Sequence, residues 1–206
     1  MNQKKQVSLG FTQKSFPAGT HMCLIYSHED DRREIISKFI KNGIIGGERV
    51  YYIADTIKPE EVREWLLNME VELPRDDCFS ILPAVNTYCP QKEFIPQKML
   101  HTIRAFYEQT VKDGYPGTRG TGEMSWALKG IAGSERLMEY EALLNEVLVT
   151  HPITVICQYD ANQFGGREIF NTLKVHPMTI VHGQVVQNPF YMKPQEFLNN
   201  LPVNDS

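Results

Sequence analysis

Side chains that could bind a small molecule follow several strand-like runs of the sequence. They combine aromatic rings with a few charged groups, and they are Tyr26, Arg119, Glu123, Trp126, Tyr159 and Asp160. Open parallel sheets bind their ligands outside the carboxyl ends of the strands, where such residues would meet. Apolar walls with a few orienting polar groups are typical of a small-molecule pocket. The pattern therefore predicts a ligand-binding crevice; the alternative is that each tyrosine only caps the core with its hydroxyl in water.

The junction after the first of these runs, SHEDDRRE (27–34), has the position of a phosphate-binding loop but not its residues. Such a loop needs glycines, which let several backbone N–H groups converge, and a lysine that reaches the β- and γ-phosphates. The junction contains neither, and Glu29, Asp30 and Asp31 stand where the next helix begins. These carboxylates occupy the free N–H groups of the helix and repel a triphosphate. We therefore expect a scaffold that recognises a ligand and does not hydrolyse ATP at this junction.

Metal binding is a second chemistry that the sequence raises. His21 and Cys23 are two residues apart, so their side chains share one face of a strand. Together with Cys157 or His176 they could complete a zinc set, but structural zinc sites usually show two close pairs, and here there is one. The competing interpretation is that the cysteines are buried free thiols of a reduced, cytoplasmic protein. We predict no metal and no other cofactor.

Enzymatic chemistry would depend on Glu123. Together with Asp160 it could form an acid–base pair for hydrolysis, but carboxyl groups at strand ends also anchor ligands or stabilise the fold. The sequence contains no GxSxG motif, which in one large class of hydrolases presents a nucleophilic serine.

Composition and charge exclude several classes of protein. The 206 residues carry 21 basic and 25 acidic side chains, for a formal net charge of −4. This balance argues against direct nucleic-acid binding, which requires a basic face. No apolar stretch approaches the roughly 18 residues that span a bilayer, and the N-terminus lacks the apolar region of a signal peptide. We expect a protein that acts away from membranes.

Strand-like runs alternate with amphipathic segments along most of the chain. Strands are predicted at 22–26, 49–54, 78–83, 118–128 (running into a turn) and 153–160, and helices at 30–42, 58–69, 96–113, 134–149 (with Ser134 as N-cap) and 165–174. A hairpin is predicted around His182 and Gly183.

Two features of this pattern define the fold class. Helices of ten or more residues between strands indicate crossover connections and a parallel sheet. Continuously apolar strands indicate a sheet that is covered on both faces. We predict a three-layer α/β/α domain over residues 18–198, with a mostly parallel sheet and an antiparallel hairpin at its C-terminal edge. A flexible leader, residues 1–17, would precede it, and a tail, residues 199–206, would follow.

The sequence resembles a known family in pieces that are spread over residues 20 to 198. They are HMCLIY (21–26), NGIIGGERVYYI (42–53), Tyr88, TRGTGEMSWAL (118–128), YEALLNE (140–146), ICQYD (156–160), HP (176–177) and NPFY (188–191). These pieces are similar to the MEDS domain, the sensory domain of methanogen and methylotroph regulators of the DcmR type. The resemblance implies a RecA/KaiC-like core with a degenerate nucleotide-binding loop. It also implies a signal-input module that senses small hydrocarbon derivatives in bacteria or archaea.

Three functions remain open at this point. The first is a non-catalytic sensor that binds a small organic ligand and signals to a partner, such as a histidine kinase or a transcription regulator. The second is an enzyme, either a residual nucleotide hydrolase or a hydrolase that uses Glu123; the third is a pure protein-interaction module. Because the chain carries no output domain, we expect a stand-alone sensor or one that works through a partner. RecA-like domains assemble with neighbouring copies, so analogy also suggests a homo-oligomer.

Overall fold

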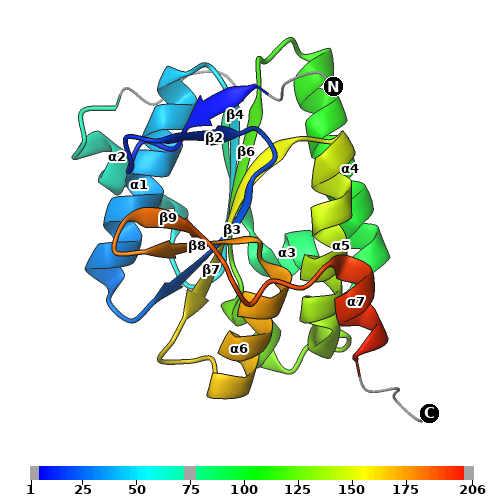
Figure 1. Ribbon diagram of the computed structural model, residues 1–206. Coiled ribbons are helices and arrows are strands. Elements are labelled where there is room, and N and C mark those ends of the chain that lie inside the picture. The colour runs from blue at the N-terminus through cyan, green and yellow to red at the C-terminus, as the bar shows by residue number, and fades with distance from the viewer. Residues whose placement is uncertain (1–4, 72–77, 202–206) are drawn as a thin grey trace.

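Seven strands lie side by side in one sheet, which Figure 1 shows between helices on its two faces. The computed structural model describes residues 5–71 and 78–201. In spatial order the strands are β5 (Phe79–Pro83), β4 (Arg49–Ala54), β6 (Thr118–Glu123), β7 (Ile153–Asp160), β3 (His21–Tyr26), β8 (Met178–Val181) and β9 (Gln184–Gln187). All neighbouring pairs are parallel except β8 and β9, which form an antiparallel hairpin. The predicted mostly parallel sheet with a hairpin at its C-terminal edge is therefore confirmed.

Helices cover both faces of this sheet (Figure 1). On one face lie α1 (Glu29–Ile45) and α2 (Pro59–Leu67), and on the other lie α4 (Pro96–Lys112) and α5 (Leu137–Thr150). The shorter helical segments are α3 (Ala84–Tyr88), α6 (Gly166–Val175), α7 (Pro194–Asn199) and the 3-10 turns η1 (Ser125–Lys129) and η2 (Ser134–Arg136). The strands β3, β4 and β7 are buried on both faces and consist mostly of apolar residues. The predicted three layers are confirmed.

The strand registers bring chemically active residues to one edge of the sheet. Tyr26, the last residue of β3, lies opposite Asp160, the last residue of β7. Glu123, the last residue of β6, lies opposite Gln158 of β7. The loops that lead from β3 into α1 and from β4 into α2 begin at the same edge, so Arg32 of α1 and Thr56 of the second loop approach Glu123.

The N-terminal segment differs from the sequence prediction. Residues 6–8 and 15–17 form two short antiparallel strands, β1 (Gln6–Ser8) and β2 (Ser15–Pro17). Val7, Leu9 and Phe16 of this segment are buried, and the last two belong to the core under α1. The prediction of a flexible leader over residues 1–17 did not include these two strands, which lie in the part that the structure describes. Strands of three residues are too short to show an alternating pattern.

The start of α5 differs from the sequence prediction. Ser134 does not cap α5, because residues 134–136 form the turn η2 and α5 begins after Arg136. Within the described residues, no helix combines the length and the apolar character needed to cross a membrane.

Candidate functional site

Glu123 is the centre of a buried polar cluster at the carboxyl edge of the sheet. Its side chain is only 2% exposed. One carboxylate oxygen accepts a hydrogen bond from the Tyr52 hydroxyl at 2.7 Å, and the other accepts bonds from the Thr56 amide at 2.5 Å and hydroxyl at 2.6 Å. Burial and the adjacent carboxylate raise the pKa of Tyr52, so its phenol stays protonated and donates. Because these bonds occupy Glu123, it acts here as an anchor for its neighbours.

Arg32, in the first turns of α1, completes this cluster from the helix side. Its side chain is 3% exposed, and its Nη1 lies 3.4 Å from Oε1 of Glu123. Nη2 forms an ion pair with Glu29 at 2.6 Å. The guanidinium carbon lies 5.2 Å from the ring centre of Tyr26 and 5.7 Å from that of Trp65. Among the described residues, Nε and Nη1 have no hydrogen-bond partner, although Nη1 lies within ion-pair distance of Glu123, so two nitrogens of a buried cation can still donate to an acceptor.

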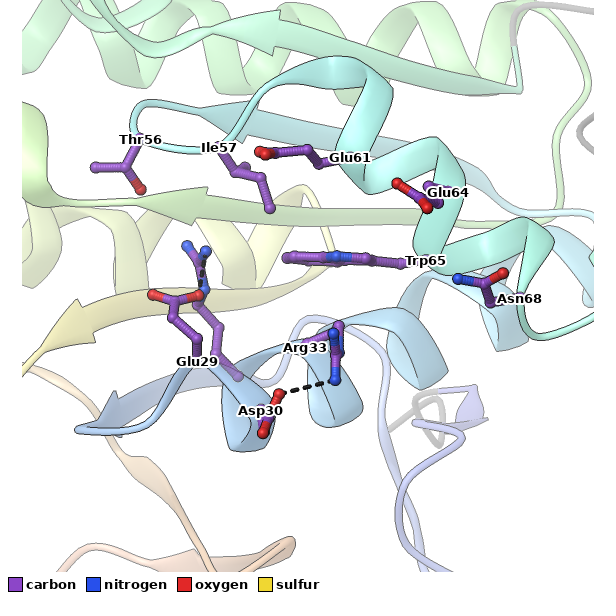
Figure 2. Close-up of a pocket in the computed structure, with 10 residues that line it drawn as sticks. Glu29, Asp30, Arg33, Thr56, Ile57, Glu61, Glu64, Trp65 and Asn68 are labelled. Atoms are coloured by element: carbon purple, nitrogen blue, oxygen red, sulfur yellow. Dashed lines mark hydrogen bonds and ion pairs between the residues drawn. The ribbon is translucent and has the colours of Figure 1, made fainter.

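A cavity of about 530 Å³ opens beside Arg32, between α1 and the segment 56–68. Figure 2 shows the Trp65 ring reaching from α2 across this cavity, with Ile57 and Thr56 above it and Glu29 and Arg33 on the α1 side. The charged groups of its lining are the carboxylates of Glu29, Asp30, Glu61 and Glu64 and the guanidinium groups of Arg32 and Arg33. Carboxylates outnumber guanidinium groups, so the cavity disfavours a polyanion such as a triphosphate.

The residues that the sequence analysis grouped in one crevice divide between the two faces of the sheet. Tyr26 and Glu123 lie near the cavity beside Arg32. Trp126 is fully buried on the opposite face and stacks on Tyr88, with ring centres 4.8 Å apart. Tyr159 is fully buried on that same face. The prediction that the three aromatic rings share one crevice is wrong, because neighbouring residues of a strand point to opposite faces.

Arg119 lies far from the carboxyl edge. It is the second residue of β6, and four residues along a strand span about 13 Å from Glu123. Its Nε pairs with the Glu48 carboxylate, and Nη2 donates to the backbone oxygen of Ser8 at 2.6 Å. The prediction that it joins Glu123 at the strand ends is therefore wrong: Arg119 ties the N-terminal segment to the sheet.

Asp160 does lie at the carboxyl edge, but its carboxylate is engaged locally. Oδ1 accepts a hydrogen bond from the Asn162 amide at 2.9 Å, and Oδ2 accepts one from the Gln163 side chain at 2.7 Å. These bonds shape the turn after β7. These local bonds give no support to the alternative in which Asp160 and Glu123 form an acid–base pair.

His21 and Cys23, the two candidate metal ligands of the sequence, have different surroundings. His21 lies in a buried group with Glu141, Cys157 and His176, whose donor atoms all lie within 4.8 Å of one another. Cys23 lies outside this group, and its thiol faces the backbone oxygen of Met178 at 3.8 Å. Glu141 was not predicted, since it lies on a helix more than a hundred residues from His21.

The residues missed at the cavity are Arg32 and Trp65. Arg32 had a usable signal, because it precedes Ile35, Ile36 and Phe39 on the apolar face of its helix, where an arginine is unexpected. Trp65 had none, since an aromatic residue on an amphipathic helix usually belongs to the core.

Comparisons with solved structures show the fold. A KaiC-like protein from Pyrococcus horikoshii superposes with a TM-score of 0.62 at 17% identity, over 86% of this chain and 80% of that protein. The flagellar accessory protein FlaH from Methanocaldococcus jannaschii gives a TM-score of 0.56 at 14% identity, over 87% and 83% of the two chains. The predicted RecA/KaiC-like architecture is confirmed.

Comparisons of sequence identify the family. Over 162 residues the chain is 25% identical to the transcriptional repressor DcmR of Methylorubrum extorquens. The match covers 77% of this chain and 58% of the repressor, so the chain spans little more than half of that relative. Residues 20–177 match the family model of MEDS, the "MEthanogen/methylotroph, DcmR Sensory domain". The chain therefore belongs to the MEDS family of sensory domains, as its sequence motifs predicted.

Proposed function

We propose that this sensory domain binds a small, partly apolar molecule in the cavity between α1 and α2. The observation that carries the proposal is Arg32, whose Nε and Nη1 have no hydrogen-bond partner among the described residues. A buried N–H donor without an acceptor costs about 1–3 kcal/mol. A ligand with an oxygen acceptor, such as a carbonyl or a single carboxylate, would recover this free energy.

The rest of the cavity favours a ligand with one polar end and one apolar end. The flat face of Trp65 and the side chain of Ile57 provide an apolar wall beside the guanidinium group. Four carboxylates against two guanidinium groups leave little attraction for a second negative charge on the ligand. We therefore expect neutral molecules or monoanions to bind and nucleoside triphosphates to bind weakly or not at all.

The position of the cavity also provides a route for the signal. One wall comes from α1 and the other from α2 with its preceding loop. A ligand that contacts both walls stabilises one relative position of the two helices, and a partner that binds this surface could distinguish the two states. The relationship to a transcriptional repressor makes a regulatory partner the first candidate.

A hydrolase that uses Glu123 is the less favoured function. Tyr52, Thr56 and Arg32 surround its carboxylate, which leaves it poorly placed to take a proton from a water molecule. An interaction module whose cavity stays empty remains the outcome if no ligand is found.

The proposal is tested by thermal-shift measurements against a panel of small carboxylic acids, ketones, amides and halogenated or methylated compounds, with Mg·ATP included. A positive compound is then titrated calorimetrically against three variants. Arg32→Lys removes Nε and Trp65→Ala removes the apolar wall, whereas Arg63→Gln changes an exposed arginine of α2 outside the cavity lining. We expect the first two variants to weaken binding by roughly 10-fold or more, at about 1.4 kcal/mol per decade, and Arg63→Gln to bind normally.

Two outcomes would contradict the proposal. Tight Mg·ATP binding with release of phosphate would restore the enzymatic interpretation. A ligand that binds equally well to Arg32→Lys and to the unchanged protein would have to occupy a different site.

A further inference from the structure

We propose that the protein holds one divalent transition-metal ion of the zinc class, buried between the sheet and α5. Its four ligands come from four separate segments of the chain and are His21, Glu141, Cys157 and His176. His21 begins β3, Cys157 lies in β7, Glu141 lies in α5, and His176 directly follows α6. All four side chains are buried. This site is independent of the cavity between α1 and α2, which lies on the opposite face of the sheet.

The distances between the donor atoms fit a tetrahedral ion. Nε2 of His21 lies 3.2 Å from Oε2 of Glu141 and 3.5 Å from Sγ of Cys157. The same Glu141 oxygen lies 3.5 Å from Nε2 of His176 and 3.5 Å from Sγ of Cys157. Metal–ligand bonds of about 2.0–2.3 Å in tetrahedral geometry place the ligand atoms about 3.3–3.8 Å apart. Four of the six distances between donor atoms therefore lie close to those around a zinc-sized ion, and the other two are at most 4.8 Å.

The hydrogen bonds of His176 set its tautomer in favour of metal binding. Its Nδ1 lies 2.8 Å from the backbone oxygen of Thr172, and a carbonyl oxygen can only accept. Nδ1 therefore carries the proton, and in the neutral ring Nε2 presents a lone pair. Nε2 is buried and has no hydrogen-bond partner among the described residues. A buried lone pair without a hydrogen-bond donor, directed at other ligand atoms, is what metal coordination requires of a histidine.

The tautomer of His21 follows from Asn145. The amide nitrogen of Asn145 donates to the backbone oxygens of residues 141, 142 and 175, which fixes the orientation of the amide. Its oxygen therefore faces Nδ1 of His21 at 3.0 Å, and that nitrogen must donate. In the neutral ring the other nitrogen, Nε2, then also presents a lone pair. Two imidazole lone pairs, a carboxylate and a sulfur thus converge on one point.

Charge and outer contacts agree with an ion at this point. A divalent cation bound by the Glu141 carboxylate and the Cys157 thiolate, with two neutral imidazoles, has a net charge of zero in the dry interior. Binding releases the thiol proton of Cys157 to solvent. Tyr159 donates to the second oxygen of Glu141 at 2.8 Å, so three of the ligands have an outer partner that holds them in place. One thiolate, two imidazoles and one carboxylate suit zinc among the available metals.

The ion would join segments that the backbone leaves far apart. It links the first residue of β3, the middle of β7 and the residue that follows α6 to α5, so it fixes that helix on the sheet. Because the unfolded chain has no such site, the binding free energy adds to the stability of the fold.

The test begins with the full chain without an affinity tag, produced in zinc-supplemented medium. We expect one equivalent of metal per chain by elemental mass spectrometry. Apoprotein prepared in chelator and denaturant is then refolded with Co²⁺, which reports on the ligands by its absorption. Four-coordinate cobalt gives strong visible bands, and the Cys157 thiolate adds a charge-transfer band in the near ultraviolet.

Three variants show whether these residues hold the ion. Cys157→Ser and His176→Gln each remove one ligand at nearly constant size. Cys23→Ser is the matched control. Cys23 is a buried cysteine that lies opposite Cys157 on the neighbouring strand, but its thiol contacts the backbone oxygen of Met178 and not the proposed site. We expect the first two to weaken cobalt binding by roughly 100-fold or more, since even loss of an outer partner costs 10–100-fold. Cys23→Ser should keep one equivalent of metal and the charge-transfer band.

Several results would overturn the inference. If wild-type protein from zinc-supplemented medium carries no metal, the cluster is only a hydrogen-bonded network of buried side chains. A wild-type cobalt spectrum without the thiolate band would exclude Cys157, and equal losses in Cys23→Ser and Cys157→Ser would assign the ion to other atoms. If Cys157→Ser fails to fold, the wild-type metal content and cobalt spectrum still decide the question.

Discussion

Arg32 and Glu123 form a buried ion pair, with Nη1 of the arginine 3.4 Å from Oε1 of the glutamate and both side chains almost inaccessible to solvent. The pair joins the first turns of α1 to the end of β6, across the edge of the sheet where this fold places its ligand sites. Glu123 is bound on its other side by Tyr52 and Thr56, so it is the better satisfied of the two. Arg32 keeps free N–H groups and lines the cavity. The glutamate therefore holds the arginine ready for an acceptor.

The substitution Glu123→Gln tests this relationship. The substitution keeps the size of the side chain but removes the buried negative charge that pairs with Arg32. It also replaces one carboxylate oxygen by an NH₂ group, which would face the donors of Tyr52 or Thr56. We expect the free energy of unfolding to fall by about 3 kcal/mol, as for other broken buried pairs. Glu64→Gln, at an exposed position of the cavity rim, is the control and should change stability by less than about 0.5 kcal/mol. Urea unfolding followed by circular dichroism measures the free energy of unfolding of both variants. Equal losses in the two would show that the buried pair stabilises the fold no more than an exposed carboxylate does.

Arg119 shows why the candidate site was only partly predictable. The sequence places it four residues before Glu123 in a glycine-rich run, and the run was correctly identified as a strand. The start of the strand was predicted correctly at residue 118, but its end was placed at residue 128, whereas β6 ends at Glu123. Boundaries are the least certain part of such a prediction. The polar partners of Arg119, at positions 8, 39 and 48, are separated from it by 71 residues or more. No local pattern carries that information.

The substitution Arg119→Lys tests the structural role that replaces the predicted ligand contact. Lysine cannot reach Glu48, Ser8 and Phe39 together, because it lacks the planar fork of the guanidinium group. We expect a loss of roughly 2–3 kcal/mol in the free energy of unfolding. Hydrogen exchange should also become faster in residues 6–17, which Arg119 holds through Ser8. Arg63→Lys, on the exposed surface of α2, should leave both measurements unchanged; unaltered exchange in Arg119→Lys would contradict the role assigned to it.

The fold itself was largely readable from the sequence, for a physical reason. Strands that are buried on both faces are usually continuous runs of apolar residues. The helices between them repeat their apolar residues every three to four positions. Those signals located β3, β4, β5, β7 and the hairpin of β8 and β9. The elements that escaped were short, such as β1, β2, α3 and α7, where three to six residues are too few for either period to appear. The buried clusters escaped because they join segments that are distant in the chain.

Gly43 offers a prediction about packing between α1 and the sheet. It lies inside α1, where alanine is normally favoured over glycine by about 1 kcal/mol. A Cβ atom there would lie 2.8 Å from Cδ of Arg119 and 2.8 Å from Cγ2 of Val50. We therefore expect Gly43→Ala to lower stability by about 1–2 kcal/mol, although the same change usually stabilises a helix. Gly166→Ala is the control: it lies at the start of α6, with no atom within 4 Å of the added carbon. A more stable Gly43→Ala protein would show that the helix can move away from the sheet.

Cys89 gives a prediction that depends on pH. Its side chain is 2% exposed, and burial foremost, followed by the Asp55 carboxylate, raises the pKa of the thiol from 9.0 to about 11. Only the thiolate reacts with an alkylating reagent, so at pH 8 the native protein should contain about 100-fold less reactive Cys89 than the unfolded chain. As the pH rises, alkylation of the unfolded chain should level off near pH 9, whereas alkylation of native Cys89 should continue to increase towards pH 11. Peptide mass spectrometry after timed iodoacetamide pulses measures the rate for this residue, with the urea-unfolded chain as reference. A native rate that levels off near pH 9 would place the thiol in contact with water and contradict its burial at the end of α3.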